Sequence, residues 1–592
     1  MSDEPWLVGV GSADITGEPW GAGMMGYGMR HQRTAGIHLR QRSRAFAFQH
    51  PGTRSRLVLV VADIGMFFAN VRAEILARLD LRPEELLLTA THTHAGPGGF
   101  SGYRMYNTTN GGLRRHTLGA IVQGVVASIE QALADLAPGR LVLSRGELHD
   151  ASVNRSPGAF TRNPGPDREH FPGGIDPTTT LLRLERGGRT VGVVNWFATH
   201  GTSLTNRNRL ISGDNKGYAA HGWEAQERPL VAAFAQTNAG DLSPNVPDAT
   251  QGPTDDEVEN TRIIGERQLV AARSLAGGSE VEGELAVLLS YVDLPGLSVQ
   301  VDGRTRRLSK AVLGASFAAG TKEGPGLPSM HEGVDANPRV LACSHLLWRL
   351  NPGLRDAQAP KAMLLPVGRF GLVADRVPIQ LVRLGPLVLI GLAQEVTVVA
   401  GLRLRRAVAE VLEVPLEDVL VQGYANDYAG YVTTPEEYDA QRYEGGHTMF
   451  GRWQLPAYVQ EVTRVALDLR DGRPGRTAGP PRLKPQKPAP ADDPGPSSCR
   501  VADPVVAGPV VTVDVSGDDP RGPARPCYFR VEAAGGEVVA DDTSWATTVR
   551  WRPEPAWSAR VTWRVPPGTT GAYRLVWLDR SGVEHPSEAF SL

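Results

Sequence analysis

Cysteine is scarce in this chain. Its 592 residues include only three cysteines, Cys343, Cys499 and Cys527. Three thiols are too few for a disulfide scaffold or for a cysteine-rich metal site. Cys499 and Cys527 could form one bridge in an oxidising compartment, but we expect unpaired thiols.

The chain also lacks an excess of charge of either sign. It contains 62 Lys and Arg residues against 64 Asp and Glu residues, for a formal net charge of −2. It has no basic stripe with interleaved aromatic residues. The sequence therefore gives no electrostatic reason to expect nucleic-acid binding.

Long apolar runs are missing as well. No run approaches the roughly 20 residues that span a bilayer, so we expect no transmembrane segment. The first residues, MSDEPWLVGVGSADITG, do not combine a basic region with a long apolar one. The sequence as given thus predicts no signal peptide, which fits either a cytoplasmic protein or a mature, trimmed form of an exported one.

The chain is long enough for two or three domains. Up to about residue 470, buried-looking strands alternate with helical patterns, as in Leu57–Ala62, Leu86–Ala90 and His116–Leu136, which predicts an α/β domain over residues 1–470. Residues 471–504 are rich in Pro, Lys, Arg and Gly without periodicity and predict an extended linker. Short alternating segments over residues 505–592 predict a small β-sandwich.

Two histidines follow one of the buried strands directly. Leu86–Ala90 runs into Thr91-His92-Thr93-His94. Residues two apart in an extended backbone point the same way, so His92 and His94 would project from one face. Imidazole is a common zinc ligand and proton carrier. The alternative is a pair of structural histidines at a strand end.

Three further strands end beside similar side chains. They are Val191–Phe197 before His200, Pro386–Ala393 before Glu395, and Val419–Gly423 before Tyr424, Tyr428 and Tyr431. In α/β sheets, ligands gather at the carboxyl ends of the strands. Two histidines and a glutamate are a standard ligand set for a catalytic zinc ion with an open position. These residues predict a metal hydrolase but leave the role of the three tyrosines open.

Other polar residues have ordinary interpretations when taken alone. Arg155, in NRSP, reads as a surface arginine, and Ser243, in GDLSPN, as a turn residue. No histidine lies near Ser243 in the sequence to activate it. Asp542, Ser544 and Thr547 offer oxygen ligands for a hard cation, or form a polar turn.

Taken together, these segments resemble the neutral (non-lysosomal) ceramidase family, amidases that split the N-acyl bond of ceramide. The matching stretches appear in family order from about residue 8 to 460: GSADITG, MMGYGM, TAGIH, ATHTHAGPGG, NRSP, NWFATHGTS, SGDNKGYAA, FAQTNAGDLSPN and YAGYVTTPEEYDAQRYEGGHTMFG. The linker and the β-sandwich fit the family's C-terminal domain. The expected fold is an α/β domain of mixed sheets with flanking helices in αββα-like layers, followed by an immunoglobulin-like β-sandwich.

The resemblance implies a zinc site and a hydrolytic mechanism. His92, His200, Glu395 and Tyr431 match the family's zinc ligands. We expect zinc-activated water to attack the ceramide carbonyl, with His94 transferring protons.

The resemblance also suggests roles for three other residues of the catalytic domain. Arg155 and Tyr443 match residues that contact substrate. Ser243 matches a serine proposed as nucleophile, which would give an acyl-enzyme instead; we favour activated water because Ser243 has no evident base.

In the C-terminal domain, Asp542, Ser544 and Thr547 match a D-x-S-x-x-T calcium site, so Ca²⁺ or Mg²⁺ is expected there. The expected partner is ceramide or a related N-acyl lipid, reached by transient contact with a membrane surface or micelle. Two alternatives stay open. One is a zinc amidase for another N-acyl lipid or a soluble N-acyl compound; the other is an inactive lipid-binding relative.

Overall fold

The structure is a computed structural model. It describes residues 6–50, 52, 55–275, 277–476, 479–490, 494–495, 498–554 and 556–592. The first five residues and part of the predicted linker, 471–504, lie outside the described residues.

The first half of the chain builds a large mixed sheet. Along the sheet its strands are β13 (Val231–Ala235), β11 (Arg189–Trp196), β10 (Thr178–Arg186), β8 (Ala137–Glu147), β1 (Trp6–Asp14), β4 (Arg42–Gln49), β5 (Arg56–Ala62) and β6 (Leu86–Ala90). The pairs β5–β6 and β11–β13 are parallel, and the other neighbours in this order are antiparallel. Strands such as β5 are almost wholly apolar because both faces of the sheet are covered.

A second sheet packs on one face of the first. It consists of β16 (Leu285–Asp293), β21 (Arg376–Leu384), β22 (Leu387–Leu392) and β24 (Val419–Gln422). Phe46 and Leu59 of the large sheet share a core with Leu389 of the small one. Alternate residues such as Ala47 and Ile390 face the other way, toward helices.

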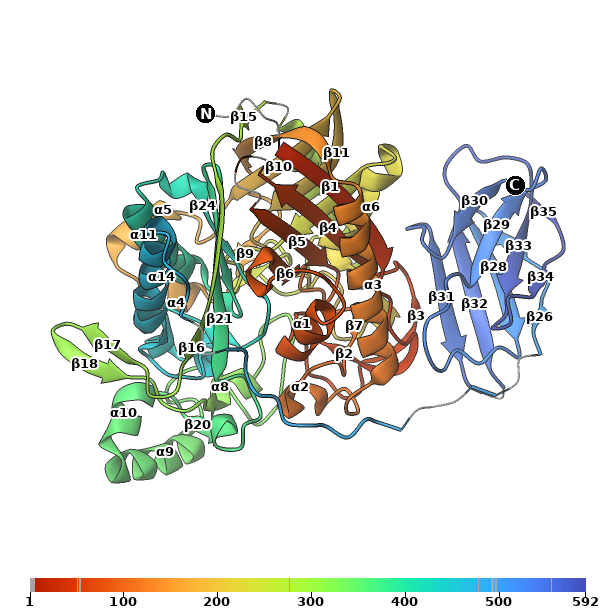
Figure 1. The fold of residues 1–592 in the computed structure, drawn as a ribbon. Coiled ribbons are helices and arrows are strands. Elements are labelled where there is room, and N and C mark those ends of the chain that lie inside the picture. Colours follow the sequence, from red (N-terminus) through yellow and green to blue (C-terminus); the bar gives the residue numbers. More distant parts are fainter. Residues whose placement is uncertain are drawn as a thin grey trace.

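Helices cover the outer face of each sheet. Helix α3 (Arg115–Ala134) lies on the large sheet, and α11 (Val398–Leu412) and α14 (Gln454–Arg470) lie on the small one (Figure 1). The order helix, sheet, sheet, helix confirms the predicted mixed sheets with flanking helices.

One helix among the described residues, α3, is long and apolar enough by length and composition to cross a membrane. It lies directly on β1. A Cβ atom at Gly9 or Gly11 would stand 2.1 Å or 2.2 Å from a backbone oxygen of this helix. Contact this close is that of a core helix, so α3 gives little support for a membrane span.

The strands after residue 498 form two antiparallel sheets around an aromatic core. One sheet contains β26 (Arg500–Val501), β28 (Val510–Ser516), β32 (Ser558–Arg564) and β31 (Thr547–Arg552), and the other contains β30 (Val538–Asp541), β29 (Phe529–Ala533), β33 (Ala572–Leu578) and β34 (Glu584–Pro586). Trp551, Trp563 and Trp577 lie between them. We call this part of the chain the sandwich; its immunoglobulin-like topology stays a prediction. The possible Cys499–Cys527 bridge is not formed, since Cys527 is a free thiol.

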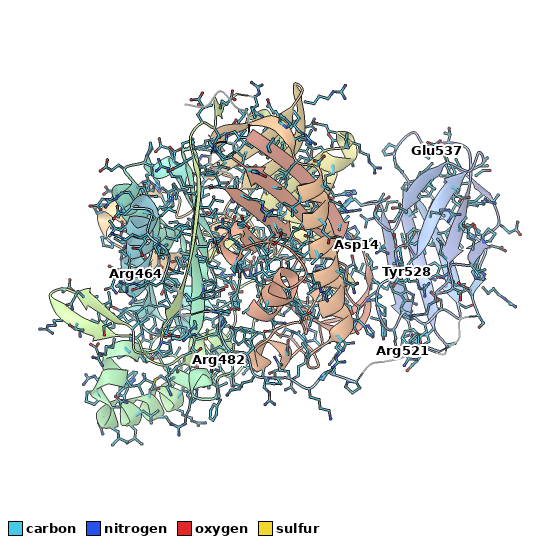
Figure 2. All side chains as sticks on the ribbon, in the orientation of Figure 1. Asp14, Arg464, Arg482, Arg521, Tyr528 and Glu537 are labelled. Carbon is cyan, nitrogen blue, oxygen red and sulfur yellow. The ribbon has the colours of Figure 1, made fainter. Side chains whose placement is uncertain are left out.

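The sandwich is joined to the rest of the protein by a shared sheet and a buried ion pair. Strand β3 (Arg33–Ile37), which follows β2 (Trp20–Met25), pairs with β31. Beside this junction the Arg40 guanidinium lies 2.8 Å from Asp14 and 2.6 Å from Asp542. Figure 2 labels Asp14 and Tyr528, which lie on either side of the junction.

We predict that Arg40→Met destabilises the sandwich by about 3–5 kcal/mol, because it leaves the buried Asp542 carboxylate without its cation. The matched control is Arg560→Met, which removes an exposed pair with Asp514 worth about 0.2–1 kcal/mol. Urea unfolding followed by tryptophan fluorescence measures both. Equal losses in the two variants would contradict a structural role for the buried pair.

Candidate metal centre

His92 leaves the sheet in an unusual backbone conformation. Strand β6 ends at Ala90, earlier than the predicted extension through His94, and His92 has a φ of +63°. Such a conformation is costly for a residue with a Cβ atom and is found where the surroundings enforce it. Here Nδ1 of His92 lies 2.6 Å from the carbonyl oxygen of Gly65, and the ring stacks on Tyr424 at 4.1 Å. The two histidines therefore converge through a turn and not through strand alternation.

Four donor atoms meet at this point. Nε2 of His92 lies 3.1 Å from Nε2 of His94 and 3.2 Å from Oε2 of Glu395, and Nε2 of His200 lies 3.1 Å from the same oxygen. All four side chains are buried. Tetrahedral ligands about 2.0–2.1 Å from a zinc ion stand about 3.3 Å from one another. The spacing of this donor cluster fits such an ion.

The groups behind the donor cluster also fit a metal. Nδ1 of His200 donates to the carbonyl oxygen of Leu242 at 2.8 Å, as Nδ1 of His92 does to Gly65. A proton held on Nδ1 leaves the lone pair of Nε2 for a metal. Burial and the neighbouring imidazoles lower the pKa of His94 well below its usual value, so that ring is neutral.

The fourth predicted zinc ligand, Tyr431, lies beside Glu395. The two residues pair in the short parallel strands β23 (Glu395–Val396) and β25 (Tyr431–Val432). The Tyr431 hydroxyl accepts an N–H of Arg155 at 3.0 Å. The hydroxyls that donate to Glu395 belong to Tyr424 and Tyr428.

Arg155 lies buried between two carboxylates, not on the surface. It donates to Glu444 at 2.8 Å, to Glu323 at 2.7 Å, to a backbone carbonyl at 2.8 Å and to Tyr431. Four of its five N–H groups are thereby used. Its guanidinium also lies 5.4 Å from the ring of Tyr443. Arg155 thus fixes both tyrosines and keeps one N–H for a further acceptor.

Ser243 is fully buried behind this arginine. Its hydroxyl donates to Glu323 and accepts the N–H of Asn245 at 3.1 Å. Glu323 lines the pocket described below, whereas Ser243 is not among the lining residues. Sequence reasoning missed Glu323, because its partner stands 80 residues earlier in the chain.

An apolar pocket of about 370 Å³ opens over the donor cluster. Five of the nine methionines of the chain line it: Met24, Met25, Met29, Met66 and Met105. Leu313, Phe317 and Leu327 add further apolar lining, and Tyr443 lines the pocket as well. Methionine side chains adapt to irregular apolar ligands.

His447 is a second residue that sequence reasoning missed. It lines the pocket, is buried, and its ring stands 4.0 Å from the ring of Phe317. Neither ring nitrogen has a hydrogen-bond partner among the described residues. Burial lowers the pKa of His447 to about 3, so it is neutral and open to a ligand. The only sequence signal for His447 is its position in the EGGHTMFG stretch, which does not follow a predicted strand.

The predicted calcium residues lie at the junction with the sandwich. Asp542 uses Oδ2 to bind Arg40 and the N–H of Tyr528, and its Oδ1 is buried without a partner among the described residues. The hydroxyls of Ser544 and Thr547 are bonded to the backbone of Asp541. An arginine on the same carboxylate opposes a cation, so these residues fit Ca²⁺ or Mg²⁺ less well than the donor cluster fits zinc.

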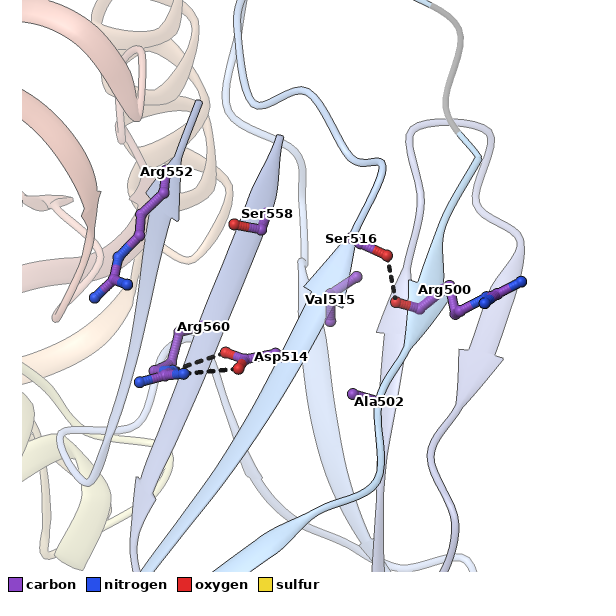
Figure 3. A pocket seen from close by; sticks show the side chains of 8 residues that line it. All are labelled: Arg500, Ala502, Asp514, Val515, Ser516, Arg552, Ser558 and Arg560. Atoms are coloured by element: carbon purple, nitrogen blue, oxygen red, sulfur yellow. Dashed lines mark hydrogen bonds and ion pairs between the residues drawn. The ribbon is translucent and has the colours of Figure 1, made fainter. Parts of the chain in front are cut away.

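Another hollow lies on the exposed face of the sandwich (Figure 3). Arg500, Arg552 and Arg560 line it, and Arg560 binds both oxygens of Asp514 at 2.7 Å. Its lining residues include no histidine and no cysteine.

Comparisons with known proteins bear on the whole chain. A family model described as neutral/alkaline non-lysosomal ceramidase, N-terminal, matches residues 6–460. The chain is 46% identical to a neutral ceramidase of Mycobacterium tuberculosis over 96% of each chain, and 41% identical to that of Pseudomonas aeruginosa over 96% of this chain and 91% of the relative. The crystal structure of the Pseudomonas aeruginosa enzyme superposes with a TM-score of 0.87 at 38% identity, over 100% of this chain and 99% of the other. A ceramidase described as complexed with C2 gives 0.90 at 40% identity, with the same coverage.

We predict that the purified protein binds about one zinc ion per chain and that His200→Ala loses it, because His200 supplies one of the four donors. The matched control is His447→Ala, which removes a buried histidine of the same pocket from outside the donor cluster. Elemental analysis by mass spectrometry gives the zinc content. Full zinc retention in His200→Ala would rule out this centre.

Proposed function

Because the chain belongs to the neutral/alkaline non-lysosomal ceramidase family, we propose that it hydrolyses the N-acyl amide bond of ceramide to sphingosine and a free fatty acid. The observation that carries this proposal is a buried donor cluster on the floor of an apolar, methionine-lined pocket. The walls suit alkyl chains, and the floor places polar groups where an amide would lie.

We further propose zinc as the cofactor, held by His92, His200, Glu395 and Tyr431. Bound there, zinc would lower the pKa of a water molecule to about 7 and polarise the amide carbonyl. The Arg155 guanidinium, 3.0 Å from the Tyr431 hydroxyl, would stabilise the negative charge of a phenolate ligand.

The remaining pocket residues would handle protons and orient the substrate. His94 belongs to the donor cluster and lines the pocket. With Tyr431 as the fourth ligand its imidazole stays free, so we assign it the transfer of a proton to the leaving sphingosine amine. The free N–H of Arg155, the Tyr443 hydroxyl and the unpartnered nitrogens of His447 would bind substrate oxygens.

Hydrolysis by activated water is better supported than attack by Ser243. The Glu323 carboxylate could serve as the base that the sequence did not reveal. A carbonyl entering the pocket would nevertheless meet the donor cluster and Glu323 before it reached the fully buried Ser243 hydroxyl. We also propose an immunoglobulin-like topology for the sandwich, without a role in the reaction.

We predict that His92→Ala abolishes fatty-acid release from ceramide, whereas Ser243→Ala lowers it by about tenfold or less. Ser243→Ala removes one hydrogen bond to a charged group, worth about 1.5 kcal/mol, and a factor of ten corresponds to about 1.4 kcal/mol. The measurement is release from a panel of ceramides, with soluble short-chain amides alongside.

Each other outcome has a distinct meaning. Inactivity of Ser243→Ala equal to that of His92→Ala would support the acyl-enzyme mechanism. Release from soluble amides alone would indicate an amidase for soluble N-acyl compounds. A protein with neither zinc nor release from any N-acyl lipid would be a lipid-binding relative.

A further inference from the structure

Large apolar side chains that face solvent gather in one segment. Of thirteen such side chains among the described residues, seven lie between residues 327 and 370. We call six of them the apolar rim: Leu327, Leu346, Leu347, Leu350, Leu365 and Phe370. Single exposed leucines are ordinary, but a concentration of them marks an interaction surface.

Helix α9 (Pro338–Leu350) supplies half of the apolar rim and turns these leucines toward solvent while it buries a serine. It buries Ser344 and Trp348, while Leu346 is 59% exposed and Leu350 is 77% exposed. The Ser344 hydroxyl accepts the N–H of Met363 at 2.8 Å, which fixes the helix on β20 (Met363–Leu365). The leucines thus face solvent because a specific polar contact holds them there.

The apolar rim is continuous with the pocket on two sides. Leu327 belongs to both, and Leu365 of β20 pairs with Leu313 of β19 (Leu313–Gly314), which lines the pocket. On the other side, the N–H of Met105, another lining residue, donates to Leu372 beside Phe370. Figure 1 shows α9, β20 and α2 (Arg104–Asn107) along the same lower edge of the molecule.

Positive charge predominates around the apolar rim, although Glu332, which pairs with Arg442, and the exposed Asp335 lie near its start. Residues 336–371 contain one carboxylate, Asp356, which is paired with Arg306. The exposed cations of the same stretch are Arg339, Arg349, Arg355 and Arg369. The segment after the catalytic domain adds Lys484, whose ammonium donates to the carbonyl of Phe370 at 3.3 Å. Exposed leucines flanked by cations are the pattern of a surface that binds anionic lipid.

We propose that the apolar rim docks this protein on an anionic lipid bilayer. The leucines of α9 enter the interface, and the flanking arginines and lysine bind lipid headgroups. This inference rests on the proposed function, since a lipid substrate could then pass from the bilayer into the pocket over apolar surface. A second copy of the chain is a poorer occupant, because two such faces would bring like charges together.

The arginine face of the sandwich is the competing surface. Arg550 and Arg560 stand directly opposite each other on β31 and β32, next to the hollow of Figure 3. On these two strands the side chains that face outward are arginine, serine and threonine, so this face offers charge without apolar groups. It therefore provides a matched control of the same sign.

The test is co-sedimentation with phosphatidylcholine–phosphatidylglycerol vesicles that contain no ceramide. We expect Leu346→Gln/Leu350→Gln to bind about tenfold more weakly or worse, because two leucines no longer enter the interface. Val505→Gln/Val506→Gln, which alters exposed apolar residues of the sandwich, should bind like the unmodified protein. Arg349→Gln/Arg369→Gln should weaken binding and reduce its salt dependence, and Arg550→Gln/Arg564→Gln should not.

Fatty-acid release separates this proposal from the proposed function. The α9 variant should keep its activity on detergent-dispersed ceramide and lose activity on ceramide in vesicles. Vesicle binding that depends on the apolar rim, without hydrolysis in either form, would uphold docking and reject the proposed function. Equal vesicle binding by all variants, loss only in the sandwich arginine variant, or a dimer that dissociates in the α9 variant would overturn the docking proposal.

Discussion

The Glu395 carboxylate is the contact on which the site depends, because it joins two sheets. His92 and His200 follow strands of the large sheet, whereas Glu395 follows a strand of the small one. One oxygen of Glu395 lies 3.1–3.2 Å from both imidazoles. The donor set therefore exists only while the two sheets remain packed face to face, and the large apolar core between them positions the polar cluster at their edge. Burial in turn lowers the pKa of His200 below its usual value and strengthens every interaction among these groups.

The polar and the apolar side chains of the site occupy separate regions. Arg155 is neutralised by Glu323 and Glu444, so a charged floor can be buried at tolerable cost. The same arginine fixes Tyr431 and Tyr443 in place. Above this floor the walls are methionine, leucine and phenylalanine, which adapt their shape without offering competing hydrogen bonds. A ligand with one polar end and long apolar chains matches this division.

Much of this arrangement could be predicted from the sequence, and the exceptions have physical reasons. The layers and the strand ends at His92, His200 and Glu395 follow from apolar periodicity, which is local. The left-handed backbone of His92 has no local signature, so the apolar pattern predicts a strand that continues past its actual end at Ala90. Glu323 and Arg40 could not be found because their partners stand 80 and 502 residues away. The choice among the three tyrosines came from resemblance, since spacing treats them alike.

The sheet shared by β3 and β31 gives the sandwich a mechanical role. The MMGYGM segment begins with the last two residues of β2 and continues into the loop before β3, and its methionines line the pocket. The strand that follows this loop, β3, is thus held by hydrogen bonds to β31, which lies near the C-terminal end of the chain. Without the sandwich, β3 would become an open sheet edge beside the pocket, able to fray or to recruit a foreign strand. The sandwich, which is remote from the donor cluster in the sequence, therefore stabilises a strand next to the opening of the pocket.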